Sequence, residues 1–275
     1  MTNELTKTLE RVKGIPAQYT FVADTTLHAI DLLVRSFCTP FKDEMVAIGP
    51  TRSDYRFAAD INHVAYREAC VDDDFQITAE GLLKVCTAQT RLIWLSAPNA
   101  VTGNYNMVRV EFNLLAERFN GLIVVDESLV DFSRQRPLRF ELPKYKKLVI
   151  LSDPGLIFTA PENIAQLRRL ESLYEYRGTT IDALPDPFDL ERTVRLTTQE
   201  RARLMDAFRL LPQCERVYAS DADFFLVRMR NAGDIVAYLA QRGISISHLP
   251  QHYVLTIPVG TRSENNELMG LLRQM

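Results

Sequence analysis

Asp126 is the residue whose type and place in this sequence most directly suggest chemistry. It closes the apolar run GLIVVD (121–126), which is short, rich in β-branched residues and therefore predicts a buried strand. Open α/β sheets bind ligands at the carboxyl ends of such strands, and a carboxylate buried there can keep a ligand nitrogen protonated. The alternative is that Asp126 only caps the turn that follows the strand.

Three other polar residues are weaker candidates for a binding site. Asn99 lies in the stretch PNAVTGN (98–104), whose Pro, Asn and Gly residues are typical of a turn after a strand. Thr25 or Thr26 could cap the helical stretch that follows and donate to an anion there, although capping alone would explain a threonine at either place. Tyr55 follows the polar stretch PTRSD.

Motifs for metals and nucleotides are weak or missing. The run Asp72–Asp74 could bind a hard cation, yet such runs are more often solvated turns. His248 and His252 are four residues apart, but Pro250 between them argues against the helix that would align them as ligands. The sequence contains no GxGxxG, Walker A or GxSxG pattern, and we expect no metal site.

Short apolar runs alternate with helical patterns through the first part of the chain. The strand-like runs are EMVAIG (44–49), HVAYREAC (63–70), RLIWLS (91–96), GLIVVDE (121–127) and KLVILS (147–152). This alternation predicts an α/β fold with a largely parallel sheet. One helical stripe lies between the third and fourth runs, and Asn106 could cap it. Its apolar residues are Val108, Phe112, Leu115 and Phe119.

The pattern changes from about residue 190, where it predicts a small α+β domain. The expected elements are a helix over 191–211 with the capping-box spacing Thr197 to Glu200, strands over 222–229 and 253–259, a helix over 234–242 ended by Gly243, and a final helix. We therefore predict a large domain over 1–185, with a short N-terminal arm at 1–19, and a small domain over 186–275. Pro185 and Pro187 mark the linker.

Three segments together resemble the histidinol-phosphate aminotransferase family. They are LIWLSAPNAVTGN (92–104), GLIVVDESLVDFS (121–133) and VLTIPVGTRSENNELMGLL (254–272). The family consists of pyridoxal phosphate (PLP) enzymes of the class I/II aminotransferase fold, also called fold type I. The resemblance implies a PLP-dependent transferase-like large domain, in which helices sandwich a mixed, mostly parallel sheet, and a small C-terminal α+β domain. It also implies that Asp126 faces the pyridine nitrogen of the cofactor, with Asn99, Thr26 and Tyr55 as residual cofactor-binding residues.

The position of the catalytic lysine departs from the family pattern. The family carries this lysine, which forms the internal aldimine, after a strand that resembles residues 148–151, and Leu156 stands at the expected place here. No lysine occurs from 148 to 275. Lys144, Lys146 and Lys147 precede the same strand and would lie ~15 Å from its carboxyl end. Leucine can form no imine and moves no proton.

Other chemical positions differ from the family as well. The donors to the phenolic oxygen of PLP, a tyrosine and an asparagine, are replaced by Leu129 and Ala100. Thr256 takes the place of the arginine that binds the substrate carboxylate, and threonine cannot make that bidentate contact. Where the family has a glycine-rich phosphate cup, this chain has ADTTLH (23–28), and an aromatic residue has become Arg52.

These changes together lead to the hypothesis of a catalytically degenerate family member, a pseudoenzyme. We assign no catalytic residue and expect no covalently bound PLP. Two alternatives stay open. One is a PLP-dependent aminotransferase that acts on a small or phosphorylated amino acid. The other is a binding protein that holds a different small molecule in the old cofactor cleft near Asp126, with Arg52 or Tyr55 contributing. The family resemblance also implies a homodimer, or a heterodimer with a related aminotransferase.

Composition narrows the class of partner and the compartment. The net charge of −3 and the lack of a cluster of Lys and Arg argue against nucleic acid. The longest apolar runs, such as LIVV and LVIL, have the length of a strand, so we expect no membrane span. The four cysteines are scattered, which favours a reducing cytoplasm over a disulfide framework or a zinc site.

Overall fold

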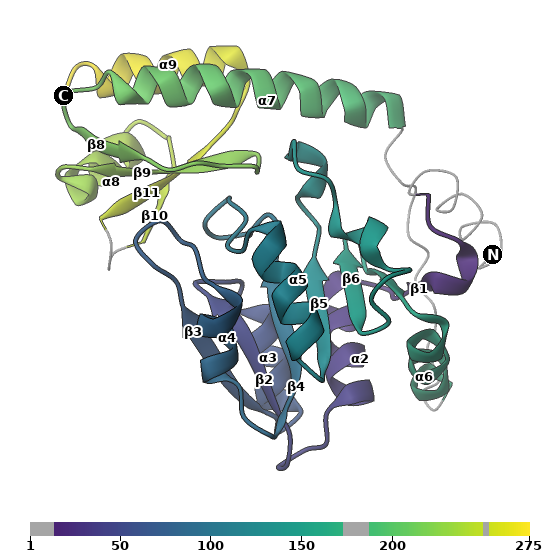
Figure 1. Cartoon of the computed structure of the whole chain (residues 1–275). Helices are drawn as coiled ribbons and strands as arrows, with labels where there is room; N and C mark the ends of the chain where they lie inside the picture. The colour runs from purple at the N-terminus through teal and green to yellow at the C-terminus, as the bar shows by residue number, and fades with distance from the viewer. Residues whose placement is uncertain (1–13, 173–186, 250–252) are drawn as a thin grey trace. The chain divides into compact units, whose positions relative to one another are not determined.

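The computed structural model describes residues 14–172, 187–249 and 253–275. The chain divides into two compact units, which are labelled by their elements in Figure 1. The first unit contains Met1–Val101, Tyr105–Ser128 and Gln135–Leu184, and the second contains Thr102–Asn104, Leu129–Arg134 and Pro185–Met275. Two short segments from the first half of the chain thus belong to the second unit. The predicted boundary between residues 185 and 186 lies outside the described residues and stays a prediction.

The first unit is built from seven strands and five α-helices in the described part of the chain. The strands are β1 (Thr20–Val22), β2 (Glu44–Gly49), β3 (Ala65–Cys70), β4 (Thr90–Ser96), β5 (Leu122–Asp126), β6 (Leu148–Ser152) and β7 (Leu156–Thr159). The helices are α2 (Thr26–Phe37), α3 (Asp54–Ile61), α4 (Ala79–Val85), α5 (Arg109–Arg118) and α6 (Pro161–Glu171). Short 3₁₀ turns are found at Ala17–Tyr19 and Leu138–Glu141.

The seven strands form one mixed sheet in the order β1-β7-β6-β5-β4-β2-β3. The neighbours from β3 to β6 are parallel, whereas β7 runs antiparallel to both β6 and β1. The carboxyl ends of β2, β4, β5 and β6 therefore lie along one edge of the sheet, here called the carboxyl edge. The opposite edge, where these strands begin, is the amino edge.

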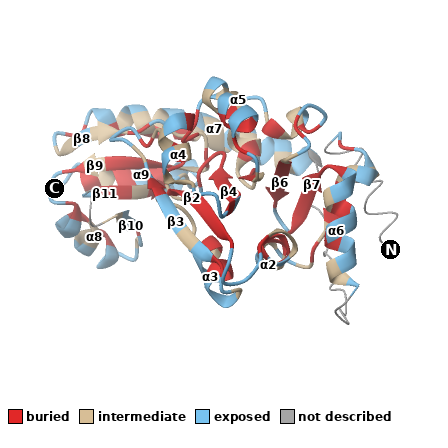
Figure 2. Cartoon of the chain, turned by 60° about the horizontal axis from the view of Figure 1, so that its bottom comes forward, coloured by how far each residue is buried: buried red, intermediate tan, exposed pale blue. Residues whose placement is uncertain are grey.

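Helices cover both faces of this sheet. Alternate strand residues enter two separate apolar clusters, because successive side chains of a strand point to opposite faces. Helices α4 and α5 contribute to the cluster that contains Val46, Ile93 and Val125, and helices α2, α3 and α6 to the cluster that contains Trp94 and Val124. The inner strands are buried in Figure 2, and the edge strand β3 is mostly exposed. The predicted α/β fold with a mostly parallel mixed sheet sandwiched by helices is confirmed.

The second unit contains a four-stranded antiparallel sheet in the order β10-β11-β9-β8. Its elements are α7 (Pro187–Arg209), β8 (Cys214–Val217), β9 (Phe224–Met229), α8 (Ala232–Ala240), β10 (Ser247–Leu249), β11 (Val254–Pro258) and α9 (Arg262–Leu272), with a 3₁₀ turn at Val130–Phe132. The three helices and the sheet share one apolar cluster. The predicted small α+β domain is thus present. Gly243 follows α8 at φ +80°, as a helix-ending glycine should.

Two capping predictions were wrong. Helix α5 begins at Arg109 after Val108, because the Asn106 side chain is buried and bonds instead to Phe75 O and Asn99. Helix α7 begins at Pro187, so Thr197 lies inside it and caps nothing.

None of the helices in the described part of the chain combines the length and apolar character that crossing a bilayer requires.

Candidate functional site

Asp126 lies at the carboxyl edge, as predicted, and its carboxylate is surrounded by donors. It is the last residue of β5, pairs with Ser96 of β4 and is 2% exposed. Oδ2 accepts hydrogen bonds from the Tyr55 hydroxyl at 2.8 Å and from Arg52 Nη1 at 3.1 Å. Oδ1 accepts from the backbone N–H and the hydroxyl of Ser128 at 3.0 and 2.5 Å. Both carboxylate oxygens are therefore engaged by this chain's own side chains and backbone.

Arg52 is held between two acidic residues. Besides its contact with Asp126, its guanidinium donates through Nε and Nη2 to Asp54 Oδ2, at 2.8 and 2.5 Å. Burial by itself would lower the pKa of Arg52, but the nearby Asp126 and Asp54 carboxylates outweigh burial and raise it. Arg52 is therefore a fixed cation beside Asp126.

Tyr55 is fully buried in α3 and links two strands. Its hydroxyl lies 3.1 Å from Ser96 Oγ as well as 2.8 Å from Asp126, and its ring stacks on Trp94 with centroids 4.6 Å apart. Burial, reinforced by the Asp126 charge, raises the pKa of Tyr55 well above its usual value. The hydroxyl stays protonated and acts as a donor to Asp126.

Thr26 lies at the start of α2, away from the Asp126 contacts that the structure records. The helix is capped by Thr25, whose hydroxyl accepts from His28 N at 3.1 Å, so the predicted capping role falls to that residue. The Thr26 hydroxyl donates to the Asp153 carboxylate, which extends from the turn between β6 and β7. The start of α2, where the family resemblance implies a phosphate, thus carries an acidic side chain.

The turn between β6 and β7 packs tightly against the start of α2. It consists of three residues, Asp153–Gly155, and Gly155 adopts φ +103°. A Cβ at Gly155 would lie 2.8 Å from the backbone of Ala23 and of Thr25, and the Ala23 N–H donates to Gly155 O at 2.8 Å. Backbone contact this close leaves no room for a side chain at Gly155.

Leu156 is fully buried at the start of β7. It pairs with Ser152 of β6 and Val22 of β1, and it belongs to the cluster on the α4 and α5 side of the sheet. A charged or reactive side chain at this place would have to enter the apolar core.

The lysines in the described part of the chain lie away from Asp126. Lys147 donates to Phe119 O just before β6, Lys146 lies 3.9 Å from Glu162, and Lys144 packs over the Tyr145 ring. All three are at the amino edge. The other two described lysines are Lys42, just before β2, and Lys84, which pairs with Glu80 of α4.

Asn99 is buried, and its side chain braces a turn. Its amide nitrogen donates to Pro50 O at 3.0 Å and to Asn106 Oδ1 at 2.6 Å, and its oxygen accepts from Val101 N at 2.7 Å. Of the four predicted cofactor residues, Asp126 and Tyr55 are joined by a direct hydrogen bond.

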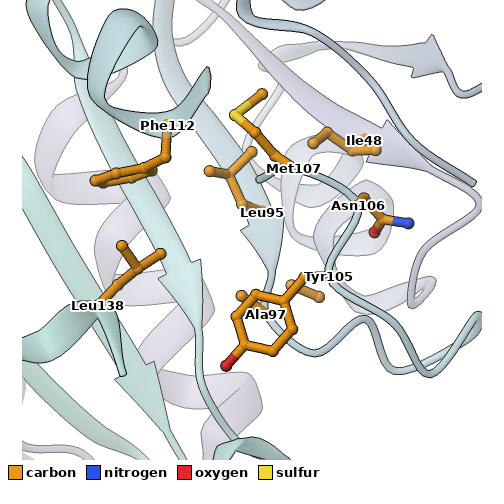
Figure 3. A pocket seen from close by; sticks show the side chains of 9 residues that line it. Ile48, Leu95, Ala97, Tyr105, Asn106, Met107, Phe112 and Leu138 are labelled. Atoms are coloured by element: carbon orange, nitrogen blue, oxygen red, sulfur yellow. The ribbon is translucent and has the colours of Figure 1, made fainter. Parts of the chain in front are cut away.

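A small pocket lies under α5 and shares Ser96 with the hydrogen-bonded residues around Asp126 (Figure 3). Its lining is mostly apolar and includes Ile48, Leu95, Ser96, Ala97, Tyr105, Asn106, Met107, Phe112 and Leu138. It contains no charged side chain, and Arg52, Tyr55 and Asp126 are not among its lining residues. The expected role of Arg52 or Tyr55 in a small-molecule cleft therefore has no support from this pocket.

The acidic run Asp72–Asp74 forms a turn. Asp72 Oδ1 accepts from the backbone N–H of Asp74 at 2.9 Å and of Gln76 at 2.8 Å. Within residues 14–172, 187–249 and 253–275, no group of three or more His, Cys, Asp or Glu side chains is arranged to hold a metal ion.

The structure places two predicted residues, Asp126 and Tyr55, in one hydrogen-bonded cluster, and their predicted role in binding a cofactor stays a prediction. The sequence indicates Arg52 only as a contact for a small molecule, and it assigns no role to Asp54, Ser96 or Ser128. Ser128 could have been anticipated, because a serine two residues after an aspartate commonly closes a local side-chain turn. The bond from Arg52 to Asp126 spans 74 residues and has no local sequence signal.

The chain is similar over its whole length to curated aminotransferases. It is 34% identical to the histidinol-phosphate aminotransferase of Bacteroides fragilis strain YCH46, covering 100% of this chain and 85% of that protein. It is also 34% identical to that of Bacteroides thetaiotaomicron, covering 98% and 84%. The first alignment extends over 293 residues, more than the 275 of this chain, so it leaves gaps in this chain. No protein-family model matches the chain.

Solved structures share the fold at low sequence identity. The histidinol-phosphate aminotransferase of Clostridium acetobutylicum superposes with a TM-score of 0.86 at 16% identity, covering 99% of this chain and 88% of that one. The enzyme of the same name from Sinorhizobium meliloti, solved in complex with pyridoxal-5'-phosphate, gives 0.83 at 16% identity, covering 99% and 80%. At such identities the likeness shows the aminotransferase fold alone.

Proposed function

The chain belongs to the histidinol-phosphate aminotransferase family, and from that premise we propose that it is a catalytically degenerate member without aldimine chemistry. The observation that carries the proposal is the connection between β6 and β7. A three-residue turn without lysine stands there, and the residue after it, Leu156, is buried in the core. Aldimine formation requires an amine within bonding distance of the cofactor carbonyl.

The residues at the candidate site do not fit the family's cofactor. PLP brings a pyridine nitrogen that needs a free carboxylate oxygen, and both oxygens of Asp126 already accept hydrogen bonds. PLP also brings a phosphate, and at the start of α2 the Thr26 hydroxyl already donates to the Asp153 carboxylate, while Gly155 packs against the backbone of Ala23 and Thr25. An acidic side chain at that place repels a phosphate.

The competing candidate is an active PLP-dependent aminotransferase that acts on a small or phosphorylated amino acid. Identity of 34% to curated histidinol-phosphate aminotransferases over the full chain favours it. The composition of the carboxyl edge opposes it, because within residues 14–172, 187–249 and 253–275 no lysine lies beside Asp126, and both oxygens of Asp126 already accept hydrogen bonds.

A PLP titration of the purified protein separates the two candidates. We expect no visible absorbance band of an internal aldimine at saturating PLP, and no single lysine modified after borohydride reduction and peptide mapping by mass spectrometry. A PLP-binding aminotransferase treated in parallel serves as the positive control. Stoichiometric trapping of PLP on one lysine would overturn the proposal and identify the catalytic residue.

We also propose that the chain assembles with a second subunit, either another copy of itself or a related aminotransferase. The proposal rests on the family resemblance. Light scattering of the protein alone, and after mixing with a related aminotransferase, measures the mass of the assembly. A mass of one chain in both samples would rule the proposal out.

The free state of all four cysteines supports a reducing cytoplasm as the location of the protein.

A further inference from the structure

The Asp126 carboxylate is a buried anion that needs a cation. It is 2% exposed, and a buried carboxylate without a positive partner is strongly disfavoured relative to water. The neutral donors Tyr55 and Ser128 supply hydrogen bonds but no charge. Among the described residues, the cation that contacts Asp126 is Arg52, at 3.1 Å.

The form of this cation matters. A guanidinium is flat and delocalised and carries N–H donors in its plane, as a protonated pyridine ring does. Asp54 holds the other side of the Arg52 guanidinium through two hydrogen bonds, so the group is fixed on Asp126 rather than free in solvent. Its side chain is 24% exposed. Arg52 thus offers Asp126 the same kind of partner that the ring of PLP would bring.

We propose that Arg52 is an internal replacement for the cofactor's ring cation, and that removal of its side chain opens a site on Asp126 for small guanidinium-type cations. This inference rests on the proposed function, from which it takes the position of the cofactor ring beside Asp126. It goes further by naming the residue that completes the site without PLP, and the class of ligand that the site would accept.

The first experiment is chemical rescue of Arg52→Ala, followed by thermal unfolding. We expect the Tm of this variant to fall by about 5–10 °C, because Asp126 is left buried without a cation. Ethylguanidinium at low millimolar concentration should restore part of the loss, whereas sodium chloride at equal ionic strength should not. A fall in Tm without rescue, or no fall, would overturn the proposal.

Arg56→Ala is the matched control. Arg56 lies four residues further along and pairs with Glu68 at 3.3 Å, with both side chains more than a third exposed. Its removal should change Tm by no more than about 2 °C and create no response to ethylguanidinium. An equal response in Arg56→Ala would mean that the ligand acts on the whole protein, and would also overturn the proposal.

A second pair of variants covers the case in which Arg52→Ala does not fold. Arg52→Lys keeps the charge, and Arg52→Met has a similar length without it. We expect Arg52→Lys to be the more stable of the two, with a Tm between those of the wild type and Arg52→Met. Equal stability of the two variants would show that the charge beside Asp126 is not needed.

The outcome is separable from that of the PLP titration. Trapping of PLP on a lysine of the wild-type protein would end the proposed function whatever the Arg52 variants do. Failure of the rescue would end the replacement role of Arg52 and leave the lack of aldimine chemistry untouched.

Discussion

The two edges of the larger sheet both bury a pair of adjacent acidic residues. Asp43 and Glu44 stand at the amino edge, where β2 begins, and Asp126 and Glu127 stand at the carboxyl edge, where β5 ends. Every one of these four carboxylates has an arginine partner. The partners are Arg91, Arg67, Arg52 and Arg139, in the same order.

The edges differ in how far these arginines are buried. At the amino edge, Arg91 and Arg67 are 50% and 54% exposed. At the carboxyl edge, Arg52 and Arg139 are 24% and 12% exposed. Open α/β sheets bind ligands at the carboxyl edge. In this chain the ion pairs at the carboxyl edge are more deeply buried than those at the amino edge. This difference is the physical basis of our proposal that the site does not hold the family's cofactor.

The largest expected effect is the loss of the Asp126 charge. Asp126→Asn should cost about 2–4 kcal/mol in free energy of unfolding, because an amide NH₂ must then face the donors Arg52 and Tyr55 or the donors of Ser128. Urea denaturation followed by circular dichroism measures the change.

Glu44→Gln is the amino-edge counterpart. Its remaining oxygen can keep the hydroxyls of Thr87 and Thr90, now at 3.1 and 2.7 Å, and half-exposed Arg67 can turn to water. We expect a loss of about 1 kcal/mol. A larger loss for Glu44→Gln than for Asp126→Asn would break the comparison of the two edges.

The turn that closes the carboxyl edge should tolerate no side chain at Gly155. Gly155→Ala should destabilise the protein by about 2 kcal/mol or more, because it adds a clash with the start of α2 to the strain of a positive φ. Gly243→Ala is the control, since Gly243 also has a positive φ but open space around it. There we expect about 1 kcal/mol. Equal losses in denaturant midpoints would show that the turn is looser than described.

The buried hydroxyl of Tyr55 should contribute more than a comparable exposed one. Tyr55→Phe removes one of the two donors to Asp126 Oδ2 and the hydroxyl that contacts Ser96, and should cost about 1–2 kcal/mol. Tyr66 of edge strand β3 also donates to a carboxylate, Glu68 at 2.9 Å, but at an exposed site. Tyr66→Phe should stay within about 0.5 kcal/mol. Similar losses for both variants, measured by thermal unfolding, would argue against a special role for the buried network.

The smallest expected effect is a contrast in pH dependence between the edges. Burial works to raise the pKa of Asp43, but the Thr39 N–H and Arg91 outweigh it and hold the pKa below 3.8. Burial raises the pKa of Glu127 above 4.5, against the opposing effect of Arg139. Asp43 therefore adds stability above pH 3.8 that disappears as the pH falls. Glu127 adds stability that is complete below pH 4.5 and is lost as the pH rises.

The measurement is the free energy of unfolding from about pH 3 to pH 7 for the wild type, Asp43→Asn and Glu127→Gln. The difference between wild type and Asp43→Asn should grow with pH, and that for Glu127→Gln should shrink. Slopes of the same sign for both variants would contradict the contrast.

The sequence predicts the sheet well and the site only in part. The strands were visible because buried parallel strands are continuous apolar runs, and Asp126 was visible because it ends one of them. The Asn106 cap failed because tertiary bonds to Phe75 and Asn99 took its side chain. The capping box at Thr197 failed because helix α7 begins ten residues earlier, at Pro187.

The pairing of Arg52 with Asp126 could not be derived from sequence. Arg52 follows β2 and Asp126 is the last residue of β5, and the two meet because both strands end at the same edge and the loop after β2 brings Arg52 to Asp126. The closure of the turn on α2 likewise depends on the exact path of Gly155. Such features arise from loop conformation, for which residue patterns carry little information.

The Arg52 and Asp126 pair also bears on how this lineage could change. If a lysine were inserted into the short turn between β6 and β7, Asp126 would still be paired with Arg52 and could not bind the cofactor ring. Loss of Arg52 by itself would leave the buried Asp126 carboxylate without a positive partner and lower the stability of the protein. Under the proposed function, a return to cofactor chemistry therefore needs two changes, a gain of lysine and a loss of Arg52, and the second is unfavourable alone.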